Sequence, residues 1–168
     1  PILAAGLPWY MAVFGRDSII SALQTKLLGP DLMIGTLHTL AALQATMVDD
    51  FRDAQPGKMP HEVRRGEVSF LDDARPARYY GSVDATPLFL TLLHEAYLWT
   101  GDEELLRRLL PAAEAALRWI DQYGDSDGDG FVEYRRRSQK GLYNQGWKDT
   151  DGAISFADGT VAQGPIAL

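Results

Sequence analysis

Residues 145–151, "QGWKDTD", place an aromatic ring, a cation and two carboxylates together just after a glycine-containing turn. A carboxylic acid that donates a proton near neutral pH needs a raised pKa, and burial beside an aromatic ring raises it because desolvation disfavours the charged form. Trp147 offers such a ring, and Asp149 or Asp151 would be the donor. Lys148 would oppose the shift if it pointed at the acid. The structural alternative, that one aspartate caps a following helix, is the more common meaning of such spacing.

A second group of chemically capable side chains lies near the N-terminus, in "GLPWYMAVFGRDS". Trp9, Tyr10 and Phe14 precede Arg16 and Asp17 at an expected helix start. Aromatic faces stack on the C–H surfaces of sugars, and an arginine fork beside a carboxylate offers donors and acceptors to adjacent hydroxyls. The alternative is that Asp17 caps the helix and Arg16 is solvated.

The segment 125–133, "DSDGDGFVE", imitates the first part of an EF-hand calcium loop. Arg136 stands where that loop has its bidentate glutamate, which argues against a complete EF-hand. A calcium ion completed by water or a distant carboxylate, and a solvated turn without metal, both stay open. The candidate structural calcium ligands, which include one backbone carbonyl, are Asp125, Asp127, Asp129, Phe131 and Glu133.

The loop "GKMPHEVRRGE" concentrates His61, Glu62, Arg64 and Arg65. It is either a rim that contacts a substrate or a salt-bridged surface loop. The sequence shows no histidine pair at zinc spacing, no glycine-rich phosphate loop and no Ser–His–Asp signature.

Composition narrows the class of protein. The chain has 168 residues, is 46% hydrophobic and carries a net charge of −7, so a folded core is expected and nucleic acid or an anionic membrane is not an expected partner. It has no cysteine, which excludes disulfides and thiol chemistry and suits the cytoplasm.

Apolar spacing predicts the elements that must position these groups. Four helices are expected, with Asp17 or Ser18 capping the first and Pro111 kinking or splitting the last. Gly29 and Gly101 predict tight helix hairpins, whereas connections of the length of 49–84 and 124–149 are usually functional. The expected helices span residues 18–28, 31–48, 87–100 and 102–123, and "FVEY" and "GAISFA" give weak strand signals.

Four segments together resemble the bacterial glycogen-debranching (amylo-α-1,6-glucosidase-like) proteins, within the inverting glycoside hydrolases that include glucoamylases and trehalases. The resemblance covers nearly the whole chain. It is carried by "GLPWYMAVFGRDSIIS", "TLAALQATMVDDFRDAQPGKMPHEVRRGE", "YYGSVDATPLFL" and "DGDGFVEYRRRSQKGLYNQGWKDTDGA".

The resemblance implies an all-α fold that is part of an (α/α)6 barrel, a six-hairpin toroid with long loops at its active-site end. Residues 1–168 would then be a partial catalytic domain, truncated at both ends, with four helices and the start of a fifth. Oligo- or polysaccharide would be the partner and no cofactor would be required.

The resemblance also implies roles for individual residues. Arg16 and Asp17 would hold a sugar, and the "GWKDTD" segment would deliver the general acid, with Asp149 the first choice and Asp151 the second. Further implied substrate contacts are Trp147, Lys148, Trp9, Tyr10, His61, Glu62 and Asp84.

The implied reaction is hydrolysis with inversion, which needs a second carboxylate roughly 6.5–9.5 Å from the acid to activate water. In relatives this base lies beyond the position of Leu168, so the isolated chain is expected to be inactive. Two alternatives stay open. The same fold could act on another sugar, such as mannosylglycerate or trehalose, or the chain could be a non-catalytic carbohydrate-binding module.

Overall fold

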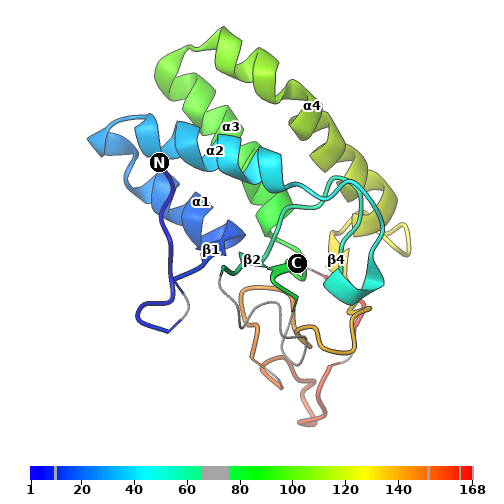
Figure 1. The fold of residues 1–168 in the computed structure, drawn as a ribbon. Helices are drawn as coiled ribbons and strands as arrows, with labels where there is room; N and C mark the ends of the chain where they lie inside the picture. Colours follow the sequence, from blue (N-terminus) through cyan, green and yellow to red (C-terminus); the bar gives the residue numbers. More distant parts are fainter. Residues whose placement is uncertain (10, 66–75, 151, 163, 168) are drawn as a thin grey trace.

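The computed structural model of the protein describes residues 1–9, 11–65, 76–150, 152–162 and 164–167. The helices gather in one half of the molecule, and the long connections and short strands lie in the other (Figure 1). The four α-helices of the described residues are α1 (Gly15–Gln24), α2 (Asp31–Leu43), α3 (Ala85–Thr100) and α4 (Glu103–Trp119). Single 3-10 turns occupy Lys26–Leu28 and Asp50–Arg52, and a π-helical turn, Ile120–Gly124, extends α4.

The helices pack as two hairpins around one hydrophobic core. α1 packs on α2 and α3, and α3 packs on α4. Gly101 ends α3 in the left-handed conformation, with φ of 64°, which lets the chain reverse at once into α4. The expected tight turns therefore form. The fully buried core residues include Ile19, Met33, Leu37, Leu40, Phe89 and Leu92.

Five short strands lie among the connections of the described residues. β1 (Val13–Phe14), β2 (Glu62–Val63) and β3 (Arg78–Tyr79) form an antiparallel sheet in that order. β4 (Glu133–Tyr134) pairs antiparallel with β5 (Ile166–Ala167). The "FVEY" signal thus corresponds to β4, whereas Ser155 of "GAISFA" makes only an isolated bridge with Val161.

The expectation of an all-α fold that is part of an (α/α)6 barrel is therefore wrong, because helices and two small antiparallel sheets occur together. The start of a fifth helix is also wrong, since the described residues of 152–167 contain no helix and end in β5. The physical reason is that the connections are partly buried. Their backbone N–H and C=O groups need partners, and short strand pairs supply them.

Helix boundaries differ from expectation where tertiary contacts intervene. α1 begins at Gly15, so Asp17 lies in its first turn and neither Asp17 nor Ser18 is the N-cap. α4 runs through Pro111 without a break. Near the C-terminal end of α4, Leu117 is exposed and Trp119 is buried.

Among the described residues, no helix has the length and apolar character needed to cross a membrane.

Candidate active site

A hollow of about 650 Å³ lies along α1, and residues from both ends of the chain meet there. Arg16 and Asp17 come from the first turn of α1, and Trp147 and Asp149 come from the connection that follows β4. The hollow therefore joins two sequence groups separated by about 130 positions. Its lining is Ala5, Arg16, Asp17, Ile20, Ser21, Gln24, Trp147 and Asp149.

Arg16 is the central cation of this hollow and is only 8% exposed. Its Nη1 donates to Asp84 Oδ2 at 2.9 Å and to the carbonyl oxygen of Gly146 at 2.8 Å. Its Nη2 donates to Asp149 Oδ2 at 3.5 Å. The buried Nε has no hydrogen-bond partner among the described residues, and Asp17 Oδ1 lies 3.9 Å from it. One donor of the guanidinium is thus unused beside the hollow.

The position of Arg16 follows from the glycine before it. A Cβ at Gly15 would lie 2.0 Å from the carbonyl oxygen of Pro60, so no larger residue fits there. The Gly15 N–H donates to the carbonyl oxygen of His61 at 3.0 Å. α1 therefore starts against the segment that leads into β2, and Arg16 is directed toward Asp84 and the 146–149 segment.

Asp149 and Trp147 are accessible from the hollow. The Asp149 side chain is 42% exposed, and Trp147 is 69% exposed. The guanidinium carbon of Arg16 lies 5.1 Å from the centre of the Trp147 ring, within the range of a cation–π contact. The ring thus covers the cation that pairs with Asp149. Lys148 is exposed and does not line the hollow.

Asp84 lies beneath the hollow and not on its surface. It is buried, and it binds Arg16 through Oδ2 and accepts from Ser82 Oγ through Oδ1 at 2.6 Å. The resemblance implies that Asp84 contacts a sugar, but both of its carboxylate oxygens bind protein donors. Its arrangement suits a residue that orients Arg16.

Other implied contacts are not brought to the hollow. The His61 ring is buried edge-on against Phe14 and Tyr79. Glu62 is buried in β2 and accepts from Arg64 Nε at 2.7 Å. Trp9 is exposed and does not line the hollow. Tyr10 and Asp151, the second choice for the acid, lie outside the described residues.

Asp53 is a buried carboxylate that the sequence reading missed, and it binds four donors from distant positions. Its Oδ1 accepts from the backbone N–H groups of Arg137 and Ser138, at 2.7 and 2.9 Å. Its Oδ2 accepts from Tyr79 Oη at 2.7 Å and Gln145 Nε2 at 3.1 Å. We call these five residues the Asp53 hub. Its donors lie 26 to 92 positions from Asp53, so no short motif reveals it.

Lys58 is a buried cation next to this hub. Its Nζ donates to the carbonyl oxygen of Asp53 at 3.2 Å and lies 5.5 Å from the centre of the Trp119 ring. Burial lowers the pKa of Lys58 to about 8, although the Asp53 carboxylate acts in the opposite direction. Lys58 lines a separate cavity of about 100 Å³ together with Glu133, Arg135 and other residues.

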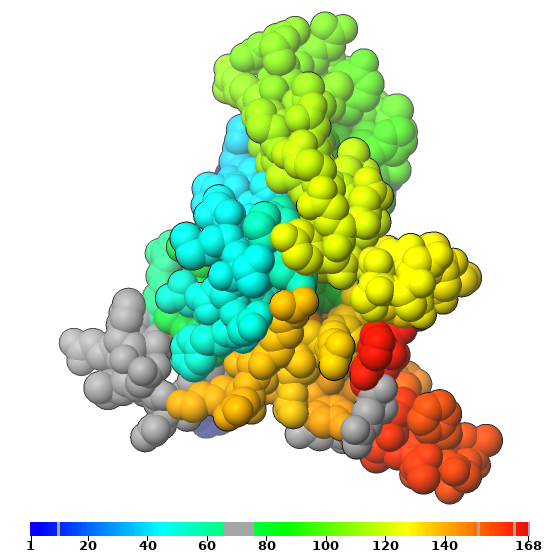
Figure 2. All heavy atoms as spheres, turned by 90° about the vertical axis from the view of Figure 1, so that its right-hand side faces the viewer, coloured from blue at the N-terminus to red at the C-terminus, as the bar shows by residue number. Residues whose placement is uncertain are grey.

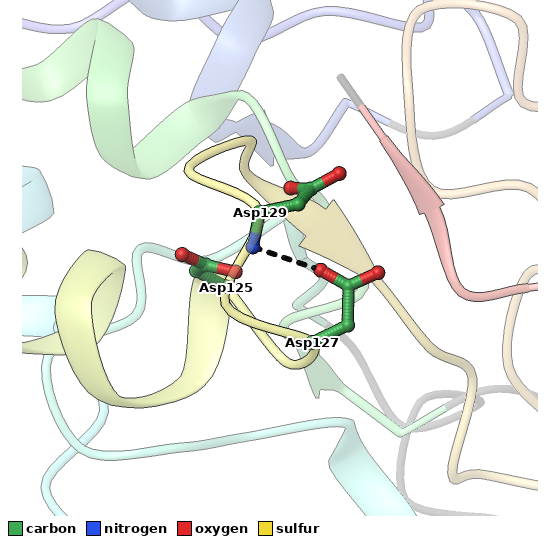
Figure 3. Close-up of side chains that lie close together, drawn as sticks. All are labelled: Asp125, Asp127 and Asp129. Carbon is green, nitrogen blue, oxygen red and sulfur yellow. Dashed lines mark hydrogen bonds between the residues drawn. The ribbon is translucent and has the colours of Figure 1, made fainter.

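The acidic loop between α4 and β4 brings three of its expected ligands together. Carboxylate oxygens of Asp125, Asp127 and Asp129 lie within 4.8 Å of one another, and Figure 3 shows all three on the same turn. The same carboxylates accept backbone N–H groups of their own loop, for example that of Asp129 on Asp127 Oδ1 at 3.1 Å. Glu133 instead accepts from Ser126. The loop thus has an internal hydrogen-bond arrangement that needs no metal, although oxygen lone pairs remain for a hard cation.

The chain matches no protein-family model and no curated protein.

Proposed function

We propose that this chain belongs to the catalytic part of an inverting glycoside hydrolase that cleaves α-glucans, of the glycogen-debranching (amylo-α-1,6-glucosidase) type. The observation that carries the proposal is the meeting of Arg16, Asp17, Trp147 and Asp149 on one hollow of about 650 Å³. A binding site for a small molecule is typically of this size and combines a few convergent polar groups with aromatic surface.

The hollow offers the groups that a sugar requires. Hydroxyls of a sugar can donate to the half-exposed carboxylates of Asp17 and Asp149, which both line the hollow. The exposed Trp147 ring provides an apolar face for C–H groups. Charged donors fixed by buried partners keep their orientation in the empty site, which reduces the entropy lost on binding.

Asp149 is the residue to which we assign proton donation to the leaving oxygen. Of the carboxylates that line the hollow, Asp17 lies on α1 and Asp149 lies on the connection after β4, two residues from Trp147. Inversion requires a second carboxylate that activates water from the other face of the sugar. None of the described residues is assigned this second role.

We also propose that the protein acts in the cytoplasm. The chain has no cysteine and so needs no oxidising compartment for disulfides. A structural calcium ion in the Asp125–Asp129 loop is likewise kept as an expectation to be tested.

The proposal is tested with the complete gene product and maltooligosaccharides or limit dextrin. Proton NMR of the first product released should show the β-anomer, because a single displacement inverts the α-linkage. Release of the α-anomer would refute inversion. Sugar binding without any turnover would instead favour the carbohydrate-binding module, and turnover confined to trehalose or mannosylglycerate would replace the substrate.

A further inference from the structure

We infer that Asp53 is a positioning residue for the segment that carries Asp149. This inference rests on the proposed function, because it assigns Asp53 a role in presenting the general acid. Asp53 lies after α2, more than 90 positions before Asp149, and it does not line the hollow.

The Asp53 carboxylate is shielded from solvent. Asp53 is 3% exposed and Gln145 is 1% exposed. A Cβ at Gly141 would lie 2.5 Å from Asp53 Oδ2 and 2.6 Å from Tyr79 Oη, so the connection is wrapped closely around the carboxylate. Figure 2 shows the segment after α2, in cyan, lying against the gold-to-orange segment of the connection that follows β4.

The hub fixes the connection at the point where the acid segment begins. Gln145 donates its amide to Asp53, and its backbone carbonyl accepts the N–H of Val83 at 2.8 Å. The Gln145 Oε1 atom is buried without a hydrogen-bond partner among the described residues. The amide is therefore oriented by its bond to the Asp53 carboxylate, since a flipped amide would place two oxygens in contact.

Only three residues separate Gln145 from Asp149, and both ends of this span are held. Asn144 is fully buried and donates Nδ2 to the carbonyl oxygen of Thr150 at 2.6 Å. Arg16 holds the Gly146 carbonyl oxygen from the side of the hollow. Asp149 itself has one long ion pair, at 3.5 Å. Its location therefore depends on the anchored residues before and after it, and Asp53 anchors the residue at which this span begins, Gln145.

The first test measures anchoring by hydrogen exchange in the complete gene product. In Asp53→Asn the negative charge is lost and one of the two acceptor oxygens becomes an N–H group, so the hydrogen bonds accepted at this position weaken. Exchange of the Arg137 and Ser138 amides should accelerate at least about tenfold, the factor expected for one lost buried hydrogen bond. The matched control is Asp50→Asn, because the Asp50 side chain is 64% exposed and its one ion pair with a described residue is with the Arg137 guanidinium, at 3.4 Å. The control should stay within about twofold.

The second test separates positioning of the acid from general damage to the fold. Hydrolysis of α-glucosyl fluoride needs little acid catalysis because fluoride leaves readily, whereas a maltooligosaccharide needs a proton on its leaving oxygen. In Asp53→Asn, kcat for the maltooligosaccharide should fall by about 10²-fold and kcat for the fluoride by only a few-fold. A purely structural role would lower both by the same factor.

Two further variants keep the inference falsifiable if Asp53→Asn does not fold. Gln145→Met removes one donor and leaves the other three hydrogen bonds of Asp53 in place. It should show the same preference for the fluoride, with a smaller loss. The double variant Asp53→Asn/Gln145→Glu exchanges amide and carboxylate and should restore much of the lost kcat.

Unchanged exchange in Asp53→Asn, or equal losses on both substrates in folded variants, would overturn the inference. A wild-type protein that cleaves neither substrate would refute the proposed hydrolase and the catalytic part of the inference together. The exchange data would still decide separately whether Asp53 anchors the connection.

Discussion

Asp53 binds the long connection that follows β4, and Asp149 lies on that connection. The two carboxylates differ in burial and in the number of hydrogen bonds that they accept. Asp53 is sealed, and its oxygens accept four hydrogen bonds of 2.7 to 3.1 Å. Asp149 is half-exposed, and among the described residues it forms one ion pair, at 3.5 Å with Arg16. A carboxylate whose acceptor sites are filled by protein donors stabilises a fold. A half-exposed carboxyl group that faces a hollow is available to a ligand, as an acceptor when it is ionised and as a proton donor when it is protonated.

The two carboxylates have different roles in the proposed site, one in positioning the backbone and one in contacting the ligand. Arg16 is intermediate between Asp53 and Asp149 in its surroundings, because it is buried like Asp53 but keeps one donor without a hydrogen-bond partner among the described residues. The Asp53 hub fixes the start of the acid segment, and Arg16 fixes the side that faces the ligand. Changes at the two carboxylates should therefore have separable effects on stability and on activity.

Replacement of Asp149 should have the largest effect on rate. In the complete gene product, Asp149→Asn should lower kcat on maltooligosaccharide by about 10² to 10⁴-fold, because the proton donor is lost. The unfolding free energy should change by less than about 1 kcal/mol, since Asp149 is 42% exposed, its ion pair with Arg16 is long at 3.5 Å, and Arg16 keeps Asp84 as a partner. Kinetics and thermal unfolding measured on one preparation check both parts. A large loss of stability would show that Asp149 resembles Asp53 after all.

Replacement of Arg16 should lower stability most. Arg16→Met leaves the buried Asp84 carboxylate without its cation, and removing one partner of a buried pair typically costs about 3–5 kcal/mol. Chemical denaturation checks this value. The matched control is Arg118→Met, because Arg118 is exposed and its pair with Glu114 is 3.7 Å long, so its effect should lie below about 1 kcal/mol. Equal effects of the two changes would contradict the buried role of Arg16.

Lys58 should make the unfolding free energy of the protein depend on pH in the alkaline range. Burial lowers the folded-state pKa of Lys58 from 10.5 to about 8, so on raising the pH the folded protein releases this proton before the unfolded chain does. The contribution of Lys58 to the unfolding free energy should therefore rise between about pH 8 and pH 10.5, by on the order of 3 kcal/mol.

The measurement is the difference in unfolding free energy between wild type and Lys58→Met across this pH range. Lys26→Met is the control, because Lys26 is partly exposed and paired with Glu95. A flat difference for Lys58→Met would mean that this lysine is not desolvated as the structure describes.

Divalent cations should have the smallest effect. The aspartates of the acidic loop already accept N–H groups of that loop, so the loop can form without metal. Unfolding midpoints of the complete gene product in calcium and in chelator should differ by less than about 2 °C, which for a chain of this length corresponds to no more than about 1 kcal/mol. A larger shift that disappears in Asp127→Asn would establish a calcium site there.

Local signals predicted the helices better than the connections. Gly29 and Gly101 mark tight turns through glycine chemistry that acts within a few residues. The start of α1 could not be read in the same way, because the Gly15 N–H binds the carbonyl of His61, which is distant in sequence. The short strands likewise pair residues from separate connections.

The candidate site divides in the same manner. Arg16 and Asp149 were identifiable because each stands in a conspicuous local cluster, and the structure places both on one hollow. Asp53 has no such cluster, since its partners become neighbours only after folding. Asp84 was noticed, but its burial beneath Arg16 depends on tertiary packing that spacing does not encode.

The most direct test of proton donation by Asp149 compares two leaving groups in Asp149→Asn. The complete gene product carrying this change should retain most of its turnover of α-glucosyl fluoride and lose about 10²-fold or more on maltooligosaccharide, because only the second substrate needs a proton from the enzyme. Equal loss on both substrates, or full activity on maltooligosaccharide, would contradict the assignment of Asp149 as the general acid.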